Sequence, residues 1–249
     1  MTVSQHDARL LPAARGALAF ALQKCCLSPL PSELGVDSAP HVEAAACAGG
    51  GCYTLVNGDG SRHARTTVDE VGYTLLFTAE ALVELWAVTA EAGGGDVAWW
   101  EAYGLVCGME FVRAFLARVD DPARCVEETY YRQNPPQPGT RTLGYTFVPL
   151  RVCTNALRLA SSLKRGGGWT PSEKEVLALQ YAEEVAGRCM TEMDRFHDAD
   201  TGLTRELLAH GWAPLVGANG EFYYLSHALE ALWMAMVRRR HGVKLPKRV

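Results

Sequence analysis

Apolar residues recur every three or four positions along most of the chain, and stretches rich in glycine, proline or serine separate these runs. This period matches one face of an α-helix, and the runs are longer than an ordinary strand. In one run, Leu75, Ala79, Leu82 and Trp86 fall on a single stripe. The pattern predicts helices over residues of about 5–26, 69–92, 96–118, 147–164, 171–194 and 226–240.

Several predicted helix ends carry capping signals. Asp69 or Thr67 is suited to cap the helix over 69–92, and the glycines at 93–95 end it. Before the helix over 171–194, Thr170 is followed by a proline and, three positions on, by Glu173. That spacing is typical of a capping box with proline at the first helical position.

Two segments between the helices predict short strand pairs. Residues 52–66 alternate apolar and polar side chains around Asn-Gly-Asp-Gly, which supplies the positive φ angles of a tight hairpin turn. A second strand pair is predicted over 204–216, turning at His210 and Gly211. Residues 28–51 lack periodicity and are interpreted as a loop insertion, and the proline-rich segment 132–141 as another loop.

Paired helices with strand pairs between them indicate one all-α domain over residues 1–249. Long apolar helices must pack against both neighbours and partners, as they do in a toroid of helical hairpins. In that architecture the strand pairs lie on a rim. A plain helical bundle predicts the same stripes but gives no reason for the strand pairs, and composition alone does not decide between the two.

Charge and composition exclude several classes of function. The net charge is -4, with positive residues dispersed until the last dozen positions, so no footprint for nucleic acid runs through the chain. No run reaches eighteen apolar residues, and charges interrupt the first twenty, so we expect a cytoplasmic protein without a membrane partner. The eight cysteines include no C-x-x-C pair and are interpreted as reduced thiols; no metal site is predicted, even at Cys47 and Cys52.

Three blocks carry a resemblance, and they follow one another in the same order as in a known family. They are CYTLVNGDGSRHARTTVDEVGYTLLFTAEALVELWAVTAEA, TLGYTFVPLRVCTNALRL, and GLTRELLAHGW with GEFYYLSHALEALWMAM. They resemble the N-acylglucosamine 2-epimerase (renin-binding protein) family, and H-A-L-E-A-x-W is the most specific match. The resemblance implies an (α/α)6 barrel of helical hairpins, here incomplete, because the family's first hairpin and C-terminal part have no counterpart.

The chain departs from the family pattern beside this motif. Gly220 is kept, but Glu221 stands where the family has an arginine, and Leu225 and Ser226 replace a Pro-Gly pair. The family's second catalytic histidine lies further on and is not matched. These departures put activity in doubt more than ancestry.

The resemblance implies that His227 and Glu230 are catalytic. Epimerisation at C2 of an amino sugar needs acid/base groups on both faces of a planar intermediate, and histidine suits that role without any cofactor. His227 falls in the first turn of its helix, where the dipole favours a neutral, proton-accepting imidazole, and Glu230 follows on the same face. The alternative is a hydrogen-bonded core histidine with Glu230 as its partner.

Other candidates have weaker support. Glu206 matches a strand glutamate of the family and Glu70 its acidic entry motif, so the resemblance makes both substrate-binding; an exposed strand position and a helix cap are the alternatives. The second acid/base group is sought at His197 or His210, in predicted turns, or in a partner subunit. Tryptophans suited either to a sugar platform or to the core are Trp86, Trp99, Trp100 and Trp233.

The leading hypothesis is an enzyme that interconverts N-acetylglucosamine and N-acetylmannosamine, weakened or inactive for want of the second histidine. A related isomerase or epimerase of mannose or cellobiose is an alternative. A non-catalytic sugar-binding or protein-interaction remnant is another. The expected partners are an amino-sugar substrate and a second copy of the chain, because a partial barrel leaves apolar flanks uncovered and favours a homodimer.

Overall fold

The chain is mainly helical in the computed structural model, which describes residues 10–22, 57–59, 61, 63, 72–93, 99–123, 138–214 and 225–240. The all-α fold predicted from the sequence is confirmed. The elements are α1 (Leu10–Phe20), α3 (Thr74–Glu91), α4 (Trp99–Ala102), α5 (Gly104–Val119), β1 (Arg141–Thr142), α6 (Gly144–Gly166), α7 (Glu173–Met193), the 3-10 turn η4 (Asp194–Phe196), β2 (Leu207–Leu208) and α8 (Leu225–Arg240).

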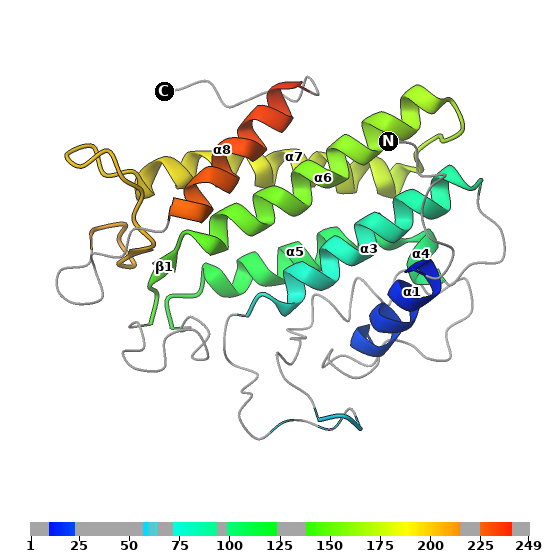
Figure 1. Cartoon of the computed structure of the whole chain (residues 1–249), viewed down its shortest axis with the longest axis horizontal. Coiled ribbons are helices and arrows are strands. Elements are labelled where there is room, and N and C mark those ends of the chain that lie inside the picture. The colour runs from blue at the N-terminus through cyan, green and yellow to red at the C-terminus, as the bar shows by residue number, and fades with distance from the viewer. Residues whose placement is uncertain are drawn as a thin grey trace.

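The helices form two layers of antiparallel pairs. α3 packs on α5 and α6 packs on α7, which makes two helical hairpins, and α8 then packs on α6. α3, α6 and α8 therefore form a front layer and α5 and α7 a back layer (Figure 1). Within the front layer the helices run in the same direction, as successive hairpins do in a toroid.

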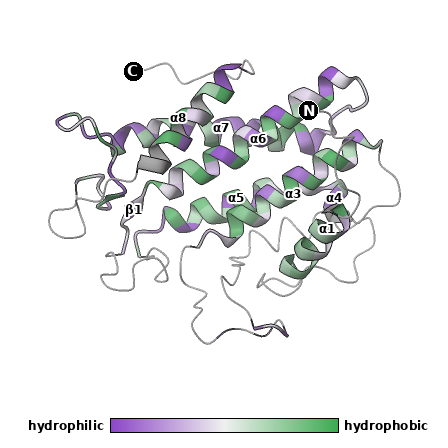
Figure 2. Cartoon of the chain, in the orientation of Figure 1, coloured by the Kyte–Doolittle hydropathy of each residue, from purple (hydrophilic) through white to green (hydrophobic). Residues whose placement is uncertain are grey.

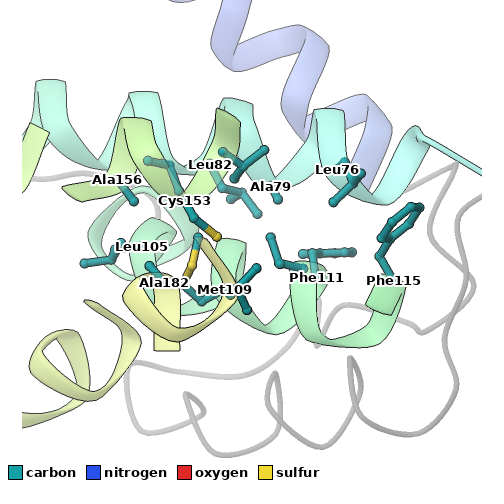
Figure 3. Packing of buried hydrophobic residues seen from close by; sticks show 14 of the residues in the cluster. Leu76, Ala79, Leu82, Leu105, Met109, Phe111, Phe115, Cys153, Ala156 and Ala182 are labelled. Atoms are coloured by element: carbon teal, nitrogen blue, oxygen red, sulfur yellow. The ribbon is translucent and has the colours of Figure 1, made fainter. Parts of the chain in front are cut away.

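The core lies between the two layers and depends on close approach of α3 and α5. A Cβ on Gly104 would lie 2.3 Å from the Leu82 carbonyl oxygen, and one on Gly108 would lie 3.0 Å from that of Ala79. These glycines let the two backbones come together, so that side chains from all four hairpin helices interdigitate (Figure 3). Figure 2 shows α1, α3 and α5 as the more apolar helices, whereas polar and apolar residues alternate along α6 and α7.

Several predicted helix ends are corrected by the structure. α3 begins at Thr74 with Tyr73 as its N-cap, whereas the predicted capping residues Asp69 and Thr67 lie outside the described residues. Its C-terminal end is as predicted, since Gly93 adopts a left-handed φ of 80°. The predicted helix over 96–118 is divided into α4 and α5 at Tyr103, whose backbone leaves the helical region.

The capping box of α7 also lies two residues later than predicted. Ser172 is the N-cap: its hydroxyl accepts a hydrogen bond from the Glu175 amide, and the Glu175 carboxylate accepts one from the Ser172 amide. Thr170 and Glu173 have the right spacing, but Ser172 and Glu175 have it too. The proline at 171 precedes the helix.

The strand predictions are confirmed in part. The Ala209 amide bonds the Ala213 carbonyl across the predicted turn at His210, but β2 pairs mainly with β1, through Arg141 to Leu208 and Thr142 to Leu207. β1 lies at the end of the segment interpreted as a loop, and α6 begins at Gly144 rather than at 147. Of residues 52–66 the turn is described, with the Asn57 amide bonded to the Ser61 carbonyl at 2.8 Å.

Some predictions lie outside the described residues, among them the loop insertion over 28–51. Within the described part, no helix combines the length and the apolar run needed to cross a membrane. α8 has an exposed apolar side made by Leu229, Leu232, Trp233 and Met236. The homodimer stays a prediction, and this side of α8 is the uncovered flank to which it applies.

Candidate functional site

The front-layer helices all begin at the end of the molecule where β1 and β2 pair (Figure 1). Thr142 in β1 donates its hydroxyl hydrogen to Oε1 of Glu206 at 3.0 Å and accepts from the amide of Gly144, the first residue of α6, at 3.3 Å. Glu206, which the resemblance matched to a strand glutamate, is buried and lies beside the N-terminus of α6. The exposed-strand alternative for Glu206 is wrong.

The start of α3 meets the start of α6 through an aromatic cluster. Tyr73 packs edge-on against Tyr145 with ring centroids 5.2 Å apart, and Phe77 follows one turn along α3. The Tyr73 hydroxyl lies so near Gly144 that a Cβ there would be 2.1 Å from it. Glycine at this position lets the tyrosine side chain cross the helix end.

Arg151, in α6, links all three front-layer helices. Its Nε and Nη2 donate to the two carboxylate oxygens of Glu80 in α3, at 2.9 and 2.8 Å. Its Nη1 lies 3.8 Å from Oε1 of Glu230 in α8. The planar guanidinium thus holds the Glu80 carboxylate by two hydrogen bonds and leaves the Glu230 carboxylate at ion-pair distance.

Glu230 and His227 lie in consecutive turns of α8, as predicted. The Glu230 side chain is 46% exposed, and Arg151 is its charged partner among the described residues. The backbone of His227 belongs to the first turn of α8, whereas its side chain lies outside the described part of the structure. The structure therefore brings Glu230 to Arg151 and Glu80, and these three side chains form a charged row across the front-layer helices. The role of His227 stays a prediction.

A second carboxyl group and a second guanidinium, those of Glu84 and Arg158, extend the charged row along α3 and α6. Glu84 is one turn beyond Glu80 on α3 and interacts with Arg158 on α6. Burial of its carboxyl by surrounding protein raises the pKa of Glu84, the positive charge of Arg158 lowers it, and the negative charge of Glu80 raises it further. The balance is a raised pKa, which moves this carboxyl toward the range of an acid/base group.

The remaining candidates fall in different places. Trp86 is a core residue, packed edge-on against Trp169 with its indole N–H donated to Glu175 at 2.8 Å, so the platform hypothesis is wrong for it. His197 and His210 are exposed on the connections around η4 and β2. Positions outside the described part of the structure are Glu70 and the side chains of Trp99 and Trp100; Trp233 is exposed on α8.

Sequence reasoning missed the centre of this site. Arg151 and Arg158 interrupt the apolar helix over 147–164, and Glu80 and Glu84 interrupt the apolar helix over 69–92. Such charges are ordinarily interpreted as a solvated face. The available signal was their spacing, because charges one or two turns apart on two apolar helices can face one another across an interhelical groove.

This arrangement offers a ligand both polar and apolar groups. An exposed aromatic ring, Phe77, lies beside a fixed guanidinium and a partly exposed carboxylate, so donors, acceptors and an apolar surface occur together. Ligand sites typically combine such surfaces with a few polar groups that fix orientation. One of the carboxyl groups, Glu84, has a raised pKa.

The comparisons with known proteins give a local similarity to a sugar isomerase. Over 55 residues the chain is 38% identical to a mannose-6-phosphate isomerase of Rhizobium meliloti (strain 1021). The matched stretch makes up 22% of this chain and 13% of that relative. No protein-family model matches the chain.

Proposed function

We propose that the chain is a carbohydrate isomerase of the 2-epimerase type that acts on N-acetylglucosamine and N-acetylmannosamine. The observation that supports it best is the position of Glu230, one turn beyond His227 and at ion-pair distance from Arg151 of α6, which itself binds Glu80 of α3. The local similarity to a sugar isomerase points to the same class of chemistry.

The proposed reaction begins with the ring-opened sugar. His227 removes the proton from C2, and the electron pair of the broken C–H bond forms a C1–C2 double bond as the carbonyl oxygen takes up the negative charge. Hydrogen-bond donors placed near that oxygen stabilise the charge. Return of a proton to the opposite face of C2 gives the epimer and restores the carbonyl.

The second acid/base group decides how far the reaction goes. With His227 alone, the proton returns to the face from which it left, and the C2 proton exchanges with solvent without inversion. Loss of one general acid or base typically costs about 10²–10⁴-fold in rate. We therefore expect slow epimerisation and faster exchange.

A mannose-type aldose–ketose isomerase is the second candidate, and the similarity to mannose-6-phosphate isomerase favours it. It shares the first step, but the proton returns to C1 while the O2 hydroxyl proton passes to O1, which converts the aldose to a ketose. The two reactions therefore differ in their products rather than in the first proton transfer.

Proton NMR in heavy water tests both candidates. The purified chain is incubated with N-acetylglucosamine, mannose or mannose 6-phosphate, and the C2 proton, the epimer and the ketose are followed. We expect loss of the C2 signal from N-acetylglucosamine, abolished in His227→Ala and kept in His197→Ala. Exchange that persists in His227→Ala would refute the catalytic role, and an inert chain that still binds sugar would favour the non-catalytic remnant.

A further inference from the structure

Phe77 is an exposed aromatic ring within a charged row. It is 51% exposed on α3, whereas its neighbours Tyr73 and Phe147 are largely covered. The Arg151 guanidinium carbon lies 5.9 Å from the Phe77 ring centroid and 5.8 Å from that of Phe147. Arg151 therefore lies near both rings, and about half of the Phe77 side chain is exposed and can contact a ligand.

Within the described part of the structure, one guanidinium nitrogen of Arg151, Nη1, makes no hydrogen bond and can donate to such a ligand. Nε and Nη2 are both bonded to Glu80, whereas Nη1 faces Glu230 at 3.8 Å, beyond hydrogen-bond distance. Two ordinary hydrogen bonds placed end to end span about 5.6 Å. Because 3.8 Å is shorter than this span, a hydroxyl oxygen would not lie on the line between Nη1 and Oε1 but to one side of it. From there it can accept a hydrogen bond from Nη1 and donate one to Oε1 of Glu230.

The net charge of the charged row favours a neutral ligand over a phosphorylated one. Glu80, Glu84 and Glu230 face two cations, Arg151 and Arg158, so the described groups carry an excess of one negative charge when all are ionised. An added phosphate would meet like charge there, and Glu80 already takes up the guanidinium edge that would hold it. Hydroxyl groups carry no such penalty.

We propose that Phe77, Arg151 and Glu230 form a subsite for a neutral, unphosphorylated hexose ring. The apolar C–H face of the sugar lies over Phe77, and one ring hydroxyl bridges Arg151 Nη1 and Glu230 Oε1. This inference rests on the proposed function, since it names residues that would hold the substrate of the same site. It disfavours a sugar phosphate such as mannose 6-phosphate as the ligand.

Equilibrium binding to the full chain, measured by titration calorimetry or ligand-observed NMR, tests the subsite without requiring turnover. We expect N-acetylglucosamine to bind at least tenfold more tightly than its 6-phosphate. Loss of the ring in Phe77→Leu weakens binding about three- to tenfold, and Phe77→Tyr restores it. Glu230→Gln, which keeps a hydrogen-bond acceptor but loses the charge, weakens it by a similar factor.

Matched controls come from the back layer. Leu177 on α7 is 58% exposed, and Arg113 on α5 is stacked on Tyr181, so Leu177→Ala and Arg113→Lys change similar surface away from the row. Both are expected to bind sugar as the wild type does. Thermal melting of each variant confirms that a weaker affinity does not come from unfolding.

The outcomes separate the subsite from the catalytic proposal. If Phe77→Leu and Glu230→Gln bind sugar unchanged while the C2 proton still exchanges, the subsite is wrong and the reaction stands. If these variants weaken binding but no exchange occurs in any chain, the subsite stands and the reaction is wrong. Tighter binding of the 6-phosphate than of the neutral sugar also overturns the subsite.

Discussion

Substitution of Gly144 by alanine tests how tightly the starts of α3 and α6 are joined. The new Cβ would lie 2.1 Å from the Tyr73 hydroxyl oxygen and 3.0 Å from Cζ, whereas ordinary contact begins at 3.4 Å, so the hydroxyl must move by 1.3 Å. The ring has little room to do so, because it packs against Tyr145 and Phe77.

Overpacking of this kind costs about 1–3 kcal/mol, while replacing glycine by alanine in a helix returns at most about 1 kcal/mol. We therefore expect Gly144→Ala to lower the free energy of unfolding by about 1–2 kcal/mol. For a chain of this size that corresponds to a fall in melting temperature of roughly 2–8 °C. The assay is urea and thermal unfolding followed by circular dichroism.

Two further variants isolate the cause. Gly187→Ala, in α7, adds a Cβ with no atom within 4 Å and should leave stability unchanged or raise it. In a Tyr73→Phe background the clashing hydroxyl is absent, so Gly144→Ala should cost about 1 kcal/mol less. If the cost is the same in both backgrounds, within about 0.5 kcal/mol, the contact with Tyr73 is not its source.

Three other predictions concern stability and reactivity. Ser172→Ala should cost about 1 kcal/mol by removing the α7 cap, whereas Thr170→Ala should stay within about 0.5 kcal/mol; equal effects in urea unfolding would contradict the capping assignment. Partial burial raises the pKa of Asp120, but hydrogen bonds and charge from Arg188, with a further contribution from a second arginine, outweigh it, and the net pKa is lowered. Stability from this pair is therefore present above the ordinary value of 3.8 and lost as pH falls through the lowered folded pKa. The melting temperature of Asp120→Asn should accordingly lie below that of the wild type at pH 7 and converge with it at acid pH. Burial raises the pKa of Cys153 to about 12, so mass spectrometry should find this thiol unlabelled by iodoacetamide at pH 8 until the chain unfolds; rapid labelling of the native protein would disprove its burial.

Periodicity predicted the helices of this fold because their apolar stripes are long and the core is continuous. It predicted their ends less well, since several polar residues near each end can serve as caps and tertiary contacts select one of them. Tyr73 is the N-cap of α3 although it makes no side-chain capping hydrogen bond, and its ring packs instead against Tyr145. The strand β1 has no periodic signal because it is two residues long. Its pairing could not be predicted either, because its partner β2 lies more than sixty positions away.

The sequence identified single residues of the candidate site but not the contacts between residues of different helices. The H-x-x-E spacing identified Glu230, and the family resemblance identified Glu206. Neither indicates that Glu230 faces Arg151 or that Glu206 accepts from Thr142, because these contacts depend on how α6 packs against its neighbours. Trp86 shows the same limit, since its helical spacing fits a core residue and a ligand platform equally well.

The way α8 is held has a consequence for local unfolding. Among its described side chains the buried contacts are Met234 and Arg238, whose guanidinium donates to Glu183 at 2.9 Å, while the opposite side of the helix is exposed. Amide hydrogens of α8 should therefore exchange through smaller openings than those of α3, which is covered on several sides. A sugar that bonds both Arg151 and Glu230 binds only when α8 is in place, so by mass action it would slow that exchange. The concentration of sugar would then determine how often the helix that carries His227 is docked.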